Sequence, residues 1–278
     1  MSQLAKLPTE LPQKLPTCDC HFHVFSAHGN AANARYVPAY SATLNDWEAR
    51  AQSAGVQRGV VVQPSFLGAD NRQLLHALAQ RPETLRGVAV VEPTASMVGL
   101  RELHVAGVRG VRLNLMGAQD DVGALRALPV SWWSALIAAD MHVELHADIG
   151  RVGVLLPFVP NEITVVLDHF AKPDRIDAQD DTVRAVAYRK HSSGATYITF
   201  SGAYRQAPAN RLICSELASL WLEELGPEQL LWASDWPCTN FESEADYAAL
   251  SMSLRCWLPH SGDHQAALAV NAQRLYWR

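Results

Sequence analysis

Eight short apolar runs, each followed by a segment with helical periodicity, constrain the fold of this chain more than any other feature of its sequence. The strands predicted from these runs cover residues 18–25, 59–65, 85–93, 108–115, 141–148, 163–169, 196–201 and 230–235. The predicted helices cover residues 71–80, 96–106, 130–139, 152–158, 181–191, 212–225, 247–257 and 264–277. Strands that alternate with helices imply parallel βαβ units. Eight such units in one α/β domain predict a closed (β/α)8 barrel.

The length and composition of the chain agree with one such barrel. Its 278 residues are close to the ~250 that a (β/α)8 barrel typically needs. Apolar residues make up 49% of the chain, so a sizeable core is available. We expect a single domain over residues 1–278, with its core at about 18–277. A doubly wound open sheet is the alternative, but the sequence contains no glycine-rich phosphate loop to support it.

Charge, cysteine content and hydropathy argue against several classes of protein. The formal net charge is -5, and the absence of like-charge runs or a basic stripe disfavours nucleic-acid and membrane-surface partners. The five cysteines are an odd number without C-x2-C spacing, which favours a reducing compartment over a disulfide framework. Residues 1–17 lack an apolar signal region, and no later run approaches the ~20 apolar residues of a membrane span. We therefore expect a soluble, cytoplasmic protein, and its oligomeric state stays open.

Polar residues gather on one face of several predicted strands. Side chains along a strand alternate between its two faces. This alternation predicts an inner face with Asp19, His21, His23 and Phe25 in the first strand, Arg112 and Asn114 in the fourth, and His142, Glu144, His146 and Asp148 in the fifth. Buried polar groups need partners, so a polar inner face indicates a functional site. The polar residues nearest the strand ends, which we expect to meet at the C-terminal mouth of the barrel, are His21, His23, Arg112, His146, His169 and Asp235.

Each of these signals also has a structural reading. An isolated H-x-H pair is more often structural or exposed than functional, but a histidine ending the sixth strand and an aspartate ending the eighth favour an active site. For His146 the structural alternative is support of its neighbours, and for Arg205, just after the seventh strand, it is an ordinary surface position. The segment 26–44 follows the first strand and so lies at the mouth, as a lid or as a plain surface loop.

Six motifs, in order, resemble the amidohydrolase superfamily. They are DCHFHVF, GVRGVRLNL, VVLDHFAKPD, ITFSGAYR, LLWASDWP and NAQRLYW, and the similarity runs over residues 18–277. Within the superfamily they are most similar to the lactonase branch typified by 2-pyrone-4,6-dicarboxylate hydrolase, which includes sugar-lactone and muconolactone hydrolases. The resemblance implies a distorted (β/α)8 barrel that hydrolyses a C–O bond in a small cyclic ester.

The resemblance also implies roles for individual residues. Asp235 matches the aspartate that activates the attacking water, and the histidines that match those around the lactone carbonyl are His21, His23 and His169. Arg112 and Arg205 match arginines that bind a carboxylate or polarise the ester, and Ser65 matches a hydroxyl contact to the substrate. Donors at the carbonyl oxygen and a carboxylate base suit ester hydrolysis. The arginine pair predicts an anionic lactone, because guanidinium binds a planar carboxylate with two hydrogen bonds.

Two departures from the pyrone-dicarboxylate pattern affect substrate and cofactor. Ala118 stands where that enzyme has a second arginine, which argues against tight recognition of two carboxylates. Glu144 and His146 replace other side chains in the fifth strand, and they complete a set similar to the mononuclear metal site of other superfamily members: His21, His23, His146 and Asp235. Such ligands suit zinc or manganese. We expect no obligatory metal; the alternatives are a metal-dependent decarboxylase of the same superfamily and a binding protein on an inactive barrel.

Overall fold

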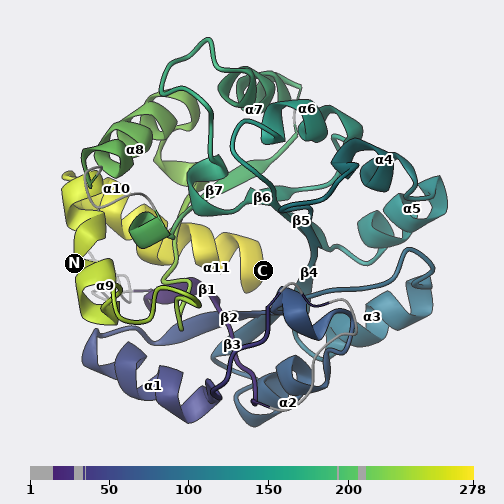
Figure 1. Cartoon of the computed structure of the whole chain (residues 1–278), viewed down its shortest axis with the longest axis horizontal. Coiled ribbons are helices and arrows are strands. Elements are labelled where there is room, and N and C mark those ends of the chain that lie inside the picture. The colour runs from purple at the N-terminus through teal and green to yellow at the C-terminus, as the bar shows by residue number, and fades with distance from the viewer. Residues whose placement is uncertain (1–14, 28–33, 35, 193, 206–210) are drawn as a thin grey trace, which may run out of the picture.

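Eight parallel strands form a barrel, which Figure 1 shows end-on. The structure is a computed structural model that describes residues 15–27, 34, 36–192, 194–205 and 211–278. The strands are β1 (Cys18–Phe22), β2 (Arg58–Val62), β3 (Leu85–Ala89), β4 (Val108–Asn114), β5 (His142–His146), β6 (Val165–Leu167), β7 (Thr196–Phe200) and β8 (Leu230–Trp232). Each strand pairs in parallel with the next one along the chain. This order confirms the predicted barrel and excludes the doubly wound sheet, in which the strand order reverses.

Helices surround the strands as an outer ring (Figure 1). The α-helices are α1 (Leu44–Ser53), α2 (Arg72–Gln80), α3 (Met97–Val105), α4 (Asp121–Arg126), α5 (Val130–Ala138), α6 (Val152–Leu155), α7 (Asp181–His191), α8 (Arg211–Leu225), α9 (Tyr247–Trp257), α10 (Ser261–Gln265) and α11 (Asn271–Tyr276). Single helical turns are η1 (Ser65–Leu67), η2 (Leu156–Phe158), η3 (His169–Ala171), η4 (Ala203–Arg205), η6 (Pro227–Gln229) and the π-helical η7 (Ala266–Val270). The sequence pattern did not predict α1 and α4.

Helix α1 packs against the first two strands through one aromatic stack. Thr43 caps its N-terminus in a capping box with Asp46, which satisfies backbone donors of the first turn. The indole of Trp47 then stacks on the ring of Phe22, with 3.9 Å between centroids. A Cβ atom at Gly59 would lie 2.6 Å from both rings, so only glycine fits beneath the stack. The contact fixes α1 against β1 and β2.

The barrel closes between β1 and β8, and a bulge in β1 changes which side chains face inward. Asp235 N donates to His21 O at 2.9 Å, and His23 N donates to Trp236 O at 2.8 Å. The β1–β2 register shifts between Asp19 and Phe22. A bulge inserts one residue, so strict alternation breaks at that point.

The bulge makes one sequence-based expectation wrong. Asp19 does not share the inner face with His21; its carboxylate accepts hydrogen bonds from Trp47 Nε1 and Tyr247 OH, which belong to the outer helices α1 and α9. Phe25 also lies beyond the strand, edge-to-face against Phe66 at 5.0 Å. Residues Cys20 and His21 both face the interior, since Cys20 packs with the inner apolar cluster and His21 contacts the inner carboxylates.

The interior is apolar at one end and polar at the other. Inward side chains near the strand beginnings pack with the C-terminal helix in one cluster: Cys18, Cys20, Val60, Val62, Val88, Val166, Tyr197, Leu231, Ala233, Ala272, Leu275 and Tyr276. Figure 1 shows α11 lying across this end of the barrel. The ring of Tyr276 meets His142 edge-on at 5.3 Å. Polar inward residues therefore collect at the opposite end, where the strands terminate.

The segment after β1 returns to the barrel at Ala42. Phe25 and Ala42 exchange two backbone hydrogen bonds of 2.9 and 2.8 Å, and Tyr36 packs on Phe66. The possible lid over 26–44 falls partly on residues 28–33 and 35, which lie outside the described residues. Among the helices that the structure describes, none is long and apolar enough to cross a membrane.

Candidate active site

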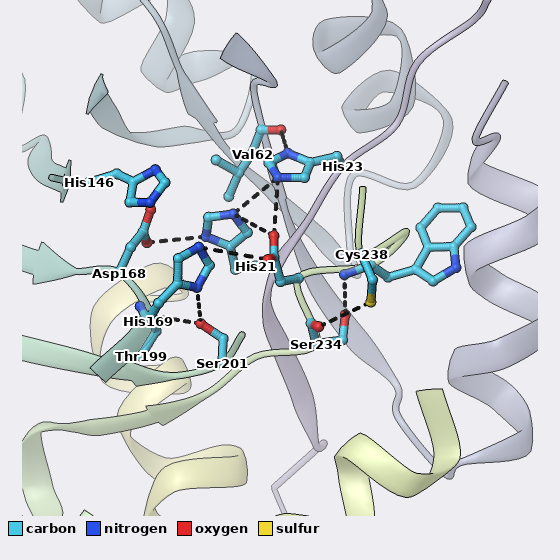
Figure 2. A network of polar contacts seen from close by, with 12 residues as sticks. His21, His23, Val62, His146, Asp168, His169, Thr199, Ser201, Ser234 and Cys238 are labelled. Carbon is cyan, nitrogen blue, oxygen red and sulfur yellow. Dashed lines mark hydrogen bonds and ion pairs between the residues drawn. The ribbon is translucent and has the colours of Figure 1, made fainter. Parts of the chain in front are cut away.

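Four histidines and three carboxylates converge where the strands end, and Figure 2 shows part of this network. His21 comes from β1, His146 from β5, and His23 lies one residue beyond β1. His169 begins η3 directly after β6, and Asp235 follows β8. The carboxyl ends of parallel strands meet at one edge, as in other barrels of this type. The structure thus brings together the residues predicted from the ends of strands one, five, six and eight.

His21 lies at the centre of the cluster, between Asp168 and His23 (Figure 2). Its Nδ1 is 3.3 Å from Glu144 Oε1 and 3.3 Å from Asp168 Oδ1. Burial lowers the pKa of His21, but Asp168 and Glu144 outweigh burial and raise that pKa to about 9. His21 is therefore an imidazolium at neutral pH, with one N–H toward the carboxylates and the other toward the mouth.

His23 is held in one tautomer. Its Nδ1 lies 2.7 Å from Val62 O, and a carbonyl only accepts, so Nδ1 carries the proton. Its Nε2 is then a lone pair, which accepts from His21 Nε2 at 3.3 Å. Burial lowers the pKa of His23 to about 4, which keeps this ring neutral.

Asp235 lies beside both of these rings. Its Oδ1 is 3.4 Å from His23 Nε2 and 3.7 Å from His21 Nε2. Its Oδ2 accepts from Tyr204 OH at 2.5 Å and from two guanidinium nitrogens of Arg205 at 2.8 and 3.0 Å. Burial raises the pKa of Asp235, but the guanidinium of Arg205 is the largest opposing influence, and the net effect holds that pKa well below its usual value. Asp235 is therefore ionised and points at the histidine cluster.

A left-handed run of backbone turns His169 into the mouth. Alternation along β6 points Asp168 inward and His169 outward, but His169, Phe170, Ala171 and Lys172 all have positive φ. Each such residue costs of the order of 1 kcal/mol or more, and strain of this kind clusters at functional sites. Phe170 stacks on Phe200 at 4.8 Å, and its carbonyl accepts from Trp221 Nε1, which holds the turn.

His169 faces both the base and the seventh strand. Its Nδ1 is 2.8 Å from Ser201 Oγ, and its Nε2 is 3.7 Å from Asp235 Oδ2. Figure 2 shows the ring contact with Ser201 and the contact of the His169 backbone N with Thr199. Burial lowers the pKa of His169 to about 3, so the ring is neutral.

Arg112 is enclosed rather than open to the mouth. Its NH2 group donates to Asp168 Oδ2 at 3.0 Å, and its Nε lies 3.4 Å from Glu144 Oε1. Only 5% of Arg112 is exposed. Burial and the neighbouring Asp168 raise the pKa of Glu144 to about 8. Arg112 thus supports Asp168, which in turn orients His21.

His146 and Lys172 form the β5 side of the mouth. Lys172 Nζ lies 2.8 Å from His146 Nε2 and donates to Ala147 O at 3.3 Å. The ring of His146 stands perpendicular to that of His169, with 5.0 Å between centroids. Burial lowers the pKa of His146 well below its usual value and lowers that of Lys172 to about 8. His146 therefore accepts a hydrogen bond from the ammonium of Lys172.

Ser65 begins η1, the turn that follows β2, and it is partly buried. Its backbone carbonyl accepts from Gly68 N at 3.1 Å, and its role in substrate contact stays a prediction.

Sequence reasoning missed three site residues: Asp168, Tyr204 and Lys172. The motifs VVLDHFAKPD and SGAYR contain all three. Their closeness in sequence to His169 and Arg205 is the feature that could have identified them.

Three of the four predicted metal ligands lie close together. The possible ligand atoms of His21, His23 and Asp235 all lie within 4.8 Å of one another, whereas His146 groups with Asp168 and His169. In a tetrahedral zinc site, Zn–N distances of about 2.0–2.1 Å separate two nitrogens by roughly 3.3–3.4 Å, which matches the 3.3 Å between the two Nε2 atoms. Oxygen partners at both Nδ1 atoms resemble the outer shell of metal-bound histidines. These residues therefore fit one divalent cation.

Comparison with known proteins places the chain in a family. Residues 18–278 match the family model described as Amidohydrolase. The chain belongs to the amidohydrolase family. This membership confirms the resemblance carried by the motifs, and it makes the chain an enzyme of the hydrolase class.

Its relatives within the family are named for lactones. The 2-pyrone-4,6-dicarboxylate hydrolase of Comamonas testosteroni is 28% identical, over 100% of this chain and 99% of its own. A 4-sulfomuconolactone hydrolase of Rhizobium radiobacter is also 28% identical, over 80% of this chain and 76% of its own. A solved structure of a probable 2-pyrone-4,6-dicarboxylic acid hydrolase from Acinetobacter baumannii, with citric acid bound, is 31% identical. It covers 95% of this chain and 100% of its own with a TM-score of 0.85. The expected lactonase branch is therefore supported.

Proposed function

We propose that this amidohydrolase opens a small carboxylated lactone by attack of a water molecule, activated by Asp235, on the ester carbonyl. The observation that carries the proposal is the geometry of Asp235. Its Oδ2 is fixed by Tyr204 and Arg205, while its Oδ1 faces two histidine Nε2 atoms. A fixed, ionised carboxylate can accept the proton of a water that it positions.

Charge developing on the carbonyl oxygen needs donors near the same point. His21 has an imidazolium N–H directed toward His23 and Asp235, and this group is charged before the substrate arrives. Preorganised donors of this kind lower the barrier to acyl transfer by several kcal/mol. We therefore assign His21 to the carbonyl oxygen, with His23 and His169 shaping the space around it.

The names of the relatives support a lactone with an acidic group. One relative is named for a pyrone dicarboxylate, another for a sulfomuconolactone, and a solved relative holds citric acid. For this chain we propose an anionic lactone of comparable size. The formal net charge of -5 makes a cationic mouth necessary for such a substrate to approach.

The cluster also fits a divalent cation, which His21, His23 and Asp235 would hold. Such an ion, when bound, acts as a Lewis acid on a carbonyl oxygen or lowers the pKa of a bound water. We propose that hydrolysis does not require it. The basis is the imidazolium of His21, whose charge is balanced by Asp168 and Asp235 and which already supplies a cationic donor at that point.

The proposal is tested with Asp235→Asn on a lactone panel containing the pyrone dicarboxylate, muconolactones and aldonolactones. The amide keeps the shape of the carboxylate but cannot accept a proton from water. We expect kcat to fall at least ~100-fold, the scale typical of general-base catalysis. Circular dichroism should show an unchanged fold.

Asp177→Asn is the matched control, because Asp177 is exposed and its carboxylate contacts only Gln179 N, at 2.8 Å, and Arg175, at 3.8 Å, among the described residues. It should hydrolyse lactones like the wild type. Turnover by Asp235→Asn within a few-fold of the control would remove Asp235 from the mechanism.

A further inference from the structure

We propose that Lys172 is the cation that binds the carboxylate of the substrate, on the β5 side of the mouth. This inference rests on the proposed function and names a specificity residue that the sequence pattern assigned instead to two arginines. The basis is a comparison of the three cations at the mouth, Arg112, Arg205 and Lys172, by whether each already has an anionic partner.

Both arginines are already paired. Arg112 contacts Asp168 at 3.0 Å and Glu144 at 3.4 Å, and it is almost fully buried. Arg205 contacts the candidate base Asp235 with two of its nitrogens. A substrate carboxylate that took either guanidinium would separate an existing pair, and breaking a buried pair is costly.

Lys172 has no such partner among the residues that the structure describes. Its Nζ contacts His146 Nε2, Ala147 O and the sulfur of Met116, none of which carries a negative charge. Among the described residues this ammonium forms no ion pair within 4.0 Å, because Asp168 and Asp235, which act on it from a longer distance, pair with other cations. A partly buried charge without a counterion is unfavourable. A carboxylate brought by the substrate would supply the missing counterion.

The backbone holds Lys172 in this unfavourable position. Lys172 ends the left-handed run that begins at His169, with φ of 43°, and Gly150 N donates to its carbonyl at 2.9 Å. A long, flexible lysine could otherwise extend into water. Left-handed backbone at a residue other than glycine persists only where surrounding contacts enforce it. The ammonium is therefore directed into the mouth by the same turn that presents His169.

The spacing across the mouth suits a planar ring. His169 adjoins Asp235, His146 adjoins His169 with 5.0 Å between ring centroids, and Lys172 adjoins His146. Two imidazole rings thus separate the ammonium from the carboxylate base. A six-membered lactone over these rings can present its carbonyl to the His21 side and an exocyclic carboxylate to Lys172.

Ligand binding without turnover gives the most direct test. Isophthalate is a planar ring with two carboxylates, and isophthalamide has the same shape without charge. Isothermal titration of the wild-type protein should show a preference for isophthalate. Lys172→Gln keeps hydrogen-bond donors but removes the charge, and it should reduce that preference at least about tenfold, the scale of one charge-assisted hydrogen bond. Lys172→Met should do the same if the glutamine variant does not fold.

Two further variants control the measurement. Lys172→Arg retains the charge and should retain part of the preference. Lys190→Gln changes an exposed lysine that also donates to backbone carbonyls, those of Glu224 and Leu225, and it should bind both ligands like the wild type. Equal weakening of isophthalate and isophthalamide by Lys172→Gln would assign Lys172 a structural role and overturn the inference.

The same variants separate this inference from the proposed function. If the wild type hydrolyses lactones but Lys172→Gln keeps the preference for isophthalate, the inference fails and the hydrolase proposal stands. If no lactone is hydrolysed but the preference for isophthalate depends on Lys172, the anion site stands and the lactone proposal fails.

Discussion

At the scale of single residues, the site is a balance of buried charges. Asp168 and Asp235 are ionised, while Arg112, Arg205 and the imidazolium of His21 offset them. His23, His146 and His169 remain neutral because burial lowers their pKa values. Arg205 has a double effect on the candidate base. It keeps Asp235 ionised at low pH, and for the same reason it makes that carboxylate a weaker proton acceptor.

Removal of Arg205 should therefore shift the pH profile. A base works in its ionised form, so activity falls as pH falls through its pKa. In Arg205→Met the pKa of Asp235 rises. The variant lacks the guanidinium that most strongly offsets the rise in pKa caused by burial. We expect the acidic limb of the kcat/KM profile to move to higher pH than in the wild type. Initial rates measured between pH 4 and 9 for both proteins would show this shift of the acidic limb.

Arg184→Met is the control for this profile, because Arg184 is exposed near the start of α7 and forms a 3.7 Å ion pair with Asp181. An acidic limb in Arg205→Met that coincides with that of Arg184→Met would show that Arg205 does not set the pKa of the base.

At the scale of elements, the termini of the strands decide what the sequence could predict. The period-two pattern of β4 and β5 correctly predicted that Arg112, Glu144 and His146 face inward, because those strands are regular. It was wrong for Asp19, because a bulge adds a residue that alternation cannot reveal. It predicted His169 only from its position at a strand end, since the left-handed turn after β6 is a tertiary feature. Lys172 was missed for that reason.

Asp19, the residue displaced by the bulge, joins four elements. Its Oδ1 accepts from Ser234 N, and its Oδ2 accepts from Ser234 Oγ, Trp47 Nε1 and Tyr247 OH. These contacts connect β1 to the segment after β8, to α1 and to α9. A carboxylate can accept all of them, but an amide presents one end that only donates. Asp19 therefore closes the barrel from outside, directly behind His21.

Asp19→Asn should consequently destabilise the fold. At least one buried donor loses its acceptor, which costs about 1–3 kcal/mol. The free energy of unfolding, measured in urea, should fall by that amount relative to the wild type. Asp263→Asn, a change at a half-buried site on α10, provides the comparison. Equal unfolding midpoints for the two variants would contradict a role for Asp19 in barrel closure.

At the scale of the whole molecule, the barrel has one open end for chemistry. The C-terminal helix packs its apolar side chains, including Tyr276, against the strand beginnings and closes the other end. Charged inward residues begin only one layer above, at Glu144 and His21. Within the residues that the structure describes, the buried network is thus closed from below by an apolar cluster and faces the end at which the strands terminate. An ion or a substrate must enter by the same route, so the two compete for the same atoms.

That competition makes metal removal informative. Prolonged dialysis against a chelator, followed by elemental analysis, gives a protein whose metal content is known. If hydrolysis needs no metal, kcat/KM on the responsive lactone should stay within about twofold of the untreated enzyme. Added zinc should then inhibit, because the cation would occupy His21, His23 and Asp235 and block the base. Activity that disappears on stripping and returns with zinc or manganese would refute the metal-free proposal and assign those three residues as ligands. Release of carbon dioxide from an aromatic acid, with metal bound and no lactone opened, would instead support a decarboxylase.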